Sequence, residues 1–174
     1  VTVNPLPTIS AASGTTICAG AKATIAATTS AGATIDWYAA ATGGTPLLSG
    51  NNSYSRSLTA TTTFYAQASN ITTGCISAAR TEVTVTVNPL PTISAASGTT
   101  ICSGATATIS STPNAAAAKE WYSAPTGGTL LQNGSTRYTS SALTTTLEYH
   151  THARKTNTSC TSAAKKASTD HIYT

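Results

Sequence analysis

Four cysteines are the most reactive side chains in this sequence, and their spacing favours disulfide bonds over metal binding. They stand at positions Cys18, Cys75, Cys102 and Cys160 of 174 residues. No two of them form a CxxC pair, and no cysteine and histidine have the spacing of zinc ligands, so a zinc site is not predicted. An even number of cysteines in small domains is typical of disulfide-bonded proteins from oxidising compartments.

Two histidines form the other candidate for chemistry. His150 and His152 alternate along a strand-like segment that also contains Glu148, a set that could bind a metal ion. We interpret the segment as an exposed polar strand face instead, because the matching positions of an internal repeat carry apolar residues. Those matching positions, 84 residues earlier, are Phe64, Ala66 and Ala68.

The five acidic residues do not suggest an active site. Asp36 and Glu120 are repeat equivalents, one in each copy, so they do not form the carboxylate pair of a glycoside hydrolase. The sequence has no G-x-S-x-G, H-E-x-x-H or phosphate-loop motif. We therefore predict no enzyme activity, no cofactor and no metal.

The chain is built from two copies of one unit. The stretch VTVNPLPTISAASGTTIC occurs unchanged at Val1–Cys18 and Val85–Cys102, a shift of 102 − 18 = 84. The tryptophans keep this shift, whereas the later cysteines are 160 − 75 = 85 apart, so one residue is inserted late in the second copy. The predicted parts are an orphan strand at 1–4, a first repeat at 5–88 and a second repeat at 89–174.

Short alternating segments between glycine and asparagine turns predict a β-sandwich in each repeat. Strands at roughly 10-residue spacing with such turns between them are typical of this architecture. A Pro-Leu-Pro joint precedes each repeat and should be stiff, because proline fixes φ. The seven strands predicted in the first repeat are 7–10, 22–30, 33–39, 45–49, 54–58, 62–69 and 76–87.

Each copy also carries a recurring set of short motifs. In the first copy they read Cys18-Ala19-Gly20, Trp37-Tyr38, Gly43-Gly44-Thr45-Pro46-Leu47, Thr62-Thr63-Phe64-Tyr65, Cys75 and Val83–Val87. This pattern resembles the Ig-like repeats of secreted surface proteins of gliding and cellulose-degrading Bacteroidota. The resemblance implies an all-β chain of two tandem Ig-like sandwiches of about seven strands each. It also implies a spacer or adhesive role, and it carries no active-site residues.

The cysteine pairing stays open between two disulfide schemes, with free thiols as a third alternative. Repeat symmetry favours bonds within each unit, Cys18–Cys75 and Cys102–Cys160, and each would stabilise by roughly 3–4 kcal/mol. In a standard Ig-like strand order, however, the two cysteines of a unit lie at opposite ends of the sandwich, beyond the ~7 Å Cα separation that a disulfide requires. The alternative pairs Cys18 with Cys160, and Cys102 with Cys75 of the next molecule.

Aromatic residues are assigned mainly to the cores. Trp37 and Trp121 alternate with polar neighbours on the apolar face of a strand, so core packing is favoured over sugar stacking. We place Tyr65 and Tyr149 in the cores as well. The tyrosines considered better candidates for exposed glycan contacts are Tyr38, Tyr54, Tyr122 and Tyr138.

The first and last strands suggest a mode of assembly. The orphan strand Val1, Thr2, Val3 and Asn4 matches the end of the last strand of the first repeat. The second repeat has Ser168 and Asp170 at the corresponding inward positions 83 and 85, so its last strand should be poor and its sandwich incomplete. We expect residues 1–4 of one molecule to dock along the final strand or open edge of the second repeat of its neighbour. A head-to-tail contact of this kind builds a filament unless it closes into a ring. The alternative is that residues 1–4 are the end of a preceding repeat in a longer natural array.

Composition limits the remaining function classes. Only 8% of residues are charged and the net charge is +4, with no dense basic stripe, so we predict no nucleic-acid partner. No run of eighteen apolar residues occurs, which predicts no membrane span. We therefore expect a secreted, cell-surface structural or adhesive protein whose partners are copies of itself or neighbouring repeats of a longer chain. The alternative is an accessory carbohydrate-binding or spacer module of a polysaccharide-degrading protein, with surface glycans as partners.

Overall fold

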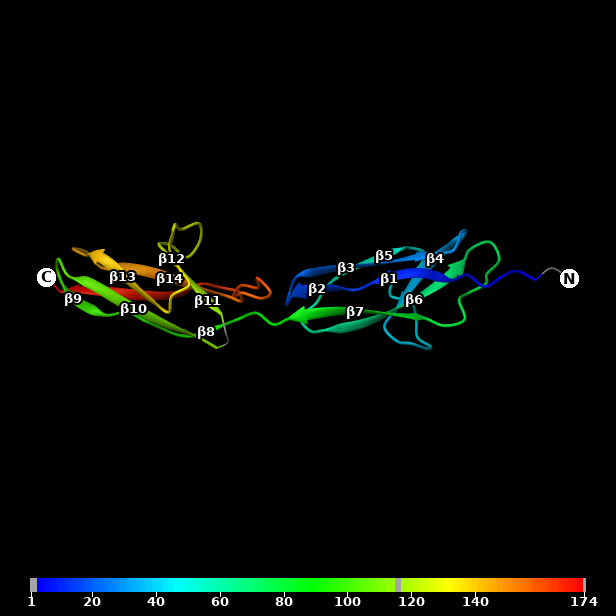
Figure 1. Ribbon diagram of the computed structural model, residues 1–174, viewed down its shortest axis with the longest axis horizontal. Helices are drawn as coiled ribbons and strands as arrows, with labels where there is room; N and C mark the ends of the chain where they lie inside the picture. The colour runs from blue at the N-terminus through cyan, green and yellow to red at the C-terminus, as the bar shows by residue number, and fades with distance from the viewer. Residues whose placement is uncertain (1–2, 115–116, 174) are drawn as a thin grey trace. The chain divides into compact units, whose positions relative to one another are not determined.

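The chain folds into two compact units that divide between Pro89 and Leu90. The computed structural model describes residues 3–114 and 117–173 (Figure 1). Val1 and Thr2 of the predicted assembly strand lie outside the described residues. No helix among the described residues is long and apolar enough to cross a membrane.

Unit 1 is a sandwich of two sheets. One sheet has the strand order β1-β3-β5 and the other β2-β7-β6-β4, and β2 runs parallel to β7 while the remaining pairs are antiparallel. Figure 1 shows β7 in green beside β2 in blue. The strands are β1 (Ile9–Ser13), β2 (Thr15–Cys18), β3 (Lys22–Thr29), β4 (Ala33–Tyr38), β5 (Ser53–Ser57), β6 (Thr62–Asn70) and β7 (Thr81–Asn88).

Four features of unit 1 differ from the prediction. The first strand is Ile9–Ser13 instead of 7–10, and the last strand begins at Thr81 instead of 76. The segment 45–49 forms only an isolated bridge between Leu48 and Trp37, and the short strand β2 was not predicted. β2 exists because the chain leaves the first sheet at Gly14 and joins the second. A Cβ atom at Gly14 would clash with the carbonyl oxygen of Thr84 on β7, so the backbones can approach this closely only at a glycine.

Unit 2 repeats this architecture with one further strand. Its sheets have the orders β13-β10-β8 and β12-β11-β14-β15-β9, and β9 runs parallel to β15. The additional strand β12 pairs with β11 at the edge of the larger sheet. The strands are β8 (Ile93–Ser97), β9 (Thr100–Cys102), β10 (Thr106–Pro113), β11 (Ala118–Tyr122), β12 (Leu130–Asn133), β13 (Arg137–Ala142), β14 (Leu147–Arg154) and β15 (Lys166–Tyr173).

The inserted residue of the second copy is a β-bulge in β13. Thr106 lies opposite Ala142 while Thr108 lies opposite Thr139, so three steps along β13 match two along β10. Ser140 is buried inside this bulge, where its hydroxyl oxygen accepts the backbone N–H of Ala107 at 3.0 Å. Residues before the bulge therefore match unit 1 at a shift of 84, and residues after it match at 85.

A stack of three aromatic rings lies in each core. In unit 1, Tyr54 lies between Trp37 and Phe64, with ring centroids 6.4 and 5.4 Å away. In unit 2, Tyr138 lies between Trp121 and Tyr149, at 6.2 and 5.1 Å. Aromatic pairs in such offset or tilted arrangements stabilise a core beyond the area they bury.

The placement of Tyr65 in the core was wrong. Tyr65 is half-buried and lies opposite Tyr38 and Glu82, whereas its neighbour Phe64 is in the core. The bulge explains the error, because it moves the repeat equivalence of β14 by one residue. Tyr149, which is buried, therefore corresponds to Phe64 and not to Tyr65.

The predicted incompleteness of the second sandwich was also wrong. β15 pairs with β14 over five residue pairs and with β9 over three, so it is hydrogen-bonded on both sides. Ser168 and Asp170 do point inward, as their positions predicted, and both are buried. The backbone ladder thus completes the sheet although two of its inward side chains are polar.

Candidate functional site

The four cysteines lie at the two ends of each unit. The entry end of a unit is where the chain begins its first strand. A backbone hydrogen bond holds the chain at this end in both units. In unit 1 the N–H of Ser30 donates to the carbonyl of Thr8, and in unit 2 the N–H of Asn114 donates to the carbonyl of Thr92. The exit end is where the last strand finishes, next to β2 in unit 1 and β9 in unit 2.

One cysteine lies at each of these ends. Cys18 lies opposite Asn88 at the exit end of unit 1, and Cys102 lies opposite the backbone of Tyr173 at the exit end of unit 2. Cys75 is at the entry end of unit 1, where its carbonyl accepts the N–H of Asn70. The carbonyl of Cys160 accepts an N–H in the matching turn of unit 2.

The predicted pairing within each unit, Cys18–Cys75 and Cys102–Cys160, was wrong. Cys18 and Cys160 are both disulfide-bonded, whereas Cys75 and Cys102 are free thiols. β6 runs from Thr62 near the exit end to Asn70 at the entry end, a length of about 26 Å at ~3.3 Å per residue. A disulfide needs Cα atoms within ~7 Å, so the length of the sandwich itself forbids the bond.

The histidines do not form a metal site. The Nε2 atom of His152 donates to the carbonyl oxygen of Ser162 at 2.7 Å, and His150 Nε2 lies 3.8 Å from Glu148 Oε2. Within the described ranges, no three His, Cys, Asp or Glu side chains are placed to hold a metal ion. His150 is buried, so the prediction that this strand face is exposed was wrong for that residue.

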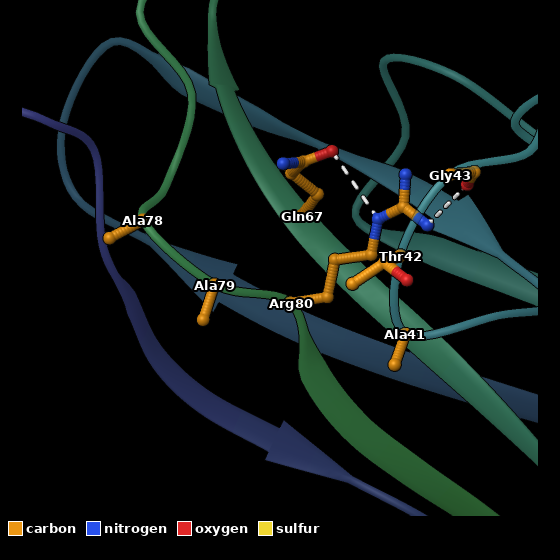
Figure 2. Close-up of a pocket in the computed structure, with 7 residues that line it drawn as sticks. All are labelled: Ala41, Thr42, Gly43, Gln67, Ala78, Ala79 and Arg80. Carbon is orange, nitrogen blue, oxygen red and sulfur yellow. Dashed lines mark hydrogen bonds between the residues drawn. The ribbon is translucent and has the colours of Figure 1, made fainter.

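The hollow shown in Figure 2 is organised by one arginine. It encloses about 440 Å³ and is lined by Arg80 and the loop around Gly43. Arg80 Nη1 donates to the carbonyl oxygens of Ala40 and Gly43 at 2.7 and 2.8 Å, and Nε donates to Gln67. The guanidinium also stacks 3.3 Å from the ring centroid of Tyr38. These contacts fasten the β4–β5 loop to the sheet.

Unit 2 has the same cation–aromatic contact, with a lysine in place of the arginine. Lys165 Nζ lies 3.5 Å from the ring centroid of Tyr122 and donates to the carbonyl of Ala124. This pair was missed in the sequence, although the repeat contains the signal. A tyrosine after the tryptophan and a basic residue before the last strand recur in both copies, at shifts of 122 − 38 = 84 and 165 − 80 = 85.

The aromatic side chains considered for glycan stacking are all engaged. Trp37 and Trp121 are completely buried, and their indole N–H groups donate to backbone carbonyls. Tyr54 and Tyr138 pack against the cores, so the prediction that they are exposed contacts was wrong. The faces of the two remaining candidates, at positions 38 and 122, are covered by the cations described above.

A polar cluster lies on the outer face of the larger sheet of unit 2. The Tyr122 hydroxyl donates to Glu120 Oε2 at 2.8 Å, and Arg154 Nη1 lies 3.5 Å from Glu120 Oε1. Burial and the adjacent carboxylate of Glu120 raise the pKa of Tyr122. The repeat counterpart of Glu120 is Asp36, which accepts the N–H of Gly50. Both acids therefore anchor the sheet and its loops and are not paired with a second carboxylate.

Two ionisable groups are buried in unit 2 without full hydrogen bonding. Burial lowers the pKa of Lys119, whose Nζ has no partner. Burial raises the pKa of Asp170, although the N–H of Thr99 and the charge of His171 oppose this shift. Asp170 Oδ1 accepts that N–H at 2.9 Å, while Oδ2 has no partner.

Comparison with known proteins agrees with the observed fold. A family model described as "Ig-like domain CHU_C associated" matches residues 5–89 and again 90–172. No curated protein sequence is significantly similar to the chain.

Solved structures with tandem domains resemble the chain at low identity. The DIP-gamma IG1+IG2 structure is 14% identical and has a TM-score of 0.46, with 98% of this chain and 99% of that chain covered. The titin I-band fragment I67-I69 is 12% identical with a TM-score of 0.47, and the match covers 98% of this chain and 66% of that chain. The fibronectin(III)-like modules of Clostridium thermocellum CbhA are 16% identical with a TM-score of 0.42, and the match covers 96% of this chain and 94% of that chain. With both sandwiches matched by the family model, the chain belongs to the family of CHU_C-associated Ig-like domains, one in each unit.

Proposed function

We propose that this protein is an extracellular structural module whose copies join head to tail into a filament on the cell surface. The observation that carries the proposal is the repetition of one Ig-like sandwich with the same Pro-Leu-Pro joint before each copy. A stiff, repeated joint serves to extend and connect. The disulfide-bonded Cys18 and Cys160 support an oxidising, extracellular location.

Strand addition by residues 1–4 is the proposed contact between molecules. The final strand β15 cannot receive them, because β14 and β9 already occupy both of its sides. The outer edge of β9 is unpaired among the described residues and remains available. Val3 is 84% exposed and lies in a segment identical to 85–88, which already forms part of a parallel pair with β2. A parallel strand on β9 would gain main-chain hydrogen bonds and cover Val3.

The test is electron microscopy and light scattering of the purified full chain over a range of concentrations. We expect filaments that grow with concentration, and monomers when residues 1–4 are deleted. Val3→Pro should act like the deletion, because proline removes a ladder N–H. Val3→Ile is the matched control and should leave filaments intact. Filaments of unchanged length in both the deletion and Val3→Pro would overturn strand addition.

Glycan binding is the competing function, and the geometry favours it less. The aromatic faces considered for sugar stacking are either in the cores or covered by Arg80 and Lys165. A glycan array probed with the purified chain separates the two functions. A structural module gives no specific hits, whereas a carbohydrate-binding module gives a consistent set that competes with free sugar.

A further inference from the structure

We propose that Cys102 of one molecule and Cys75 of the next form a disulfide that locks the filament covalently. In this scheme the intermolecular bond joins the repeat equivalents of Cys18 and Cys160, which are both disulfide-bonded. The inference rests on the proposed head-to-tail association. Its starting point is that two cysteines of the chain are bonded and their two repeat equivalents are free.

Chain connectivity explains why these two thiols are left over. The three-residue linker Pro89-Leu90-Pro91 joins the exit end of unit 1, which carries Cys18, to the entry end of unit 2, which carries Cys160. Cys102 and Cys75 occupy the same kinds of end, but no linker joins those two ends within one molecule. A second copy placed head to tail supplies the missing neighbour for each.

The local backbones present the free and bonded cysteines in the same way. The N–H groups of Cys75 and Cys160 both lie within hydrogen-bonding distance of a threonine hydroxyl two residues earlier, at 3.3 and 3.4 Å. Cys18 and Cys102 each begin a tight turn in which their carbonyl accepts an N–H three residues later. Each turn also contains a glycine with φ near +85°, Gly20 or Gly104. Neither free thiol therefore needs a backbone change to take the role of its bonded equivalent.

Exposed apolar side chains give an independent indication that these two ends are covered. Ile71 and Ile76 flank Cys75 at the entry end of unit 1 and are 78% and 50% exposed. Leu147, at the exit end of unit 2, is 42% exposed. The counterparts of all three in the other unit are threonines: Thr156, Thr161 and Thr62. Apolar side chains thus replace threonines at both ends that would meet between molecules, and a second copy is the occupant that the repeat predicts.

The bond forms by two exchange steps with a low-molecular-weight disulfide such as oxidised glutathione. The thiolate of Cys75 attacks one sulfur of that disulfide, which forms a mixed disulfide and releases one small thiol. The thiolate of Cys102 from the neighbouring molecule then attacks the protein sulfur and releases the second small thiol. Two protein thiols are oxidised and one small disulfide is reduced to two thiols, so electrons and protons balance.

The experiment incubates the full chain in a glutathione redox buffer and separates the products on a non-reducing gel. We expect a ladder of covalent multimers, with Cys75–Cys102 and Cys18–Cys160 peptides in the digest. Cys75→Ser and Cys102→Ser should each run only as monomers on the denaturing gel, and an equimolar mixture should give covalent dimers and nothing larger. Ser49→Cys in the Cys102→Ser background is the matched control, an exposed thiol away from both ends, and should not restore the ladder.

Three results would overturn the inference. These are symmetric Cys75–Cys75 or Cys102–Cys102 peptides, a ladder that survives Cys75→Ser, or a control that multimerises as well as the parent. Light scattering of the same samples in reductant separates this inference from the proposed function. Association without the Cys75–Cys102 peptide removes only the bond, whereas monomers in both oxidised and reduced buffer remove the head-to-tail association as well.

Discussion

Replacing Asp170 with valine should stabilise unit 2. Asp170 is 0% exposed, Oδ1 accepts the N–H of Thr99, and Oδ2 has no partner. Unit 1 has Val85 at the matching position, also 0% exposed, so the site accommodates the apolar shape. Replacing a buried ionisable group by a well-packed apolar one gains on the order of 1–4 kcal/mol, the range for replaced buried ion pairs, and the orphaned N–H costs about 1–3 kcal/mol. We expect a net gain of about 1 kcal/mol near neutral pH, or roughly 4–8 °C in Tm for a domain of this size.

The effect should depend on pH with a defined sign. The pKa of Asp170 is raised in the folded protein, chiefly by burial. Below the ordinary aspartate pKa of about 3.9, both folded and unfolded chains hold the proton, and the wild type has its full stability. As pH rises, the unfolded chain loses its proton first, so wild-type stability falls until the raised pKa is passed. The gain from Asp170→Val should therefore grow between pH 3 and pH 7.

Urea unfolding followed by hydrogen-exchange mass spectrometry measures this separately in each unit. Peptides from β14 and β15 report unit 2, and peptides from β6 and β7 report unit 1. The matched control is Val85→Asp, which should destabilise unit 1 by roughly 3 kcal/mol because it buries a carboxylate at an apolar site. If Asp170→Val lowers the stability of unit 2 at pH 7, or shifts it equally at pH 3 and pH 7, the reasoning fails.

Three further substitutions test other features of the two units. Lys119→Ile gives unit 2 the isoleucine that unit 1 has at the equivalent position 35, and it should stabilise unit 2 by about 1–3 kcal/mol. Because burial lowers the pKa of Lys119, the stability of the wild type should rise towards pH 10. The stability of the variant should not rise in this way, which thermal melts at several pH values would show. Ser159 has φ +57°, so Ser159→Gly should increase the free energy of unfolding of unit 2 by roughly 0.5–1 kcal/mol, seen as a higher urea midpoint. Gly98→Ala would drive a Cβ into the carbonyl of Thr169 and should cost about 3 kcal/mol or more, measured by the same urea titration.

The repeat and the period-2 alternation were enough to predict the fold, because they record which side chains face the core. They predicted β3, β4 and β6 to within a residue or two at each end. They could not predict β2, since its existence depends on a close backbone approach at Gly14 that only the folded structure reveals. The position of the inserted residue could not be predicted either, because apolar and polar residues keep alternating on both sides of a bulge.

The candidate site was predictable only in part. The objection to Cys18–Cys75 followed from the length of a sandwich, and the structure bears it out with free Cys75 and Cys102. The cation–aromatic pairs were missed because the two partners are far apart in sequence. Arg80 and Tyr38, for example, are brought together only when β4 and β7 lie on either side of β6.

Two buried ionisable residues in the core of unit 2 lower its stability separately. Lys119 lies opposite Ala153 on β14, whereas Asp170 lies opposite Leu147 on the same strand. Six residues of strand separate these two positions, about 20 Å at ~3.3 Å per residue, so the two buried charges cannot form an ion pair. Each must be desolvated alone, which costs stability that unit 1 does not lose at Ile35 and Val85. Unit 2 should therefore be the weaker domain, and a disulfide at Cys160 ties down the entry end of the unit that has the greater need of it.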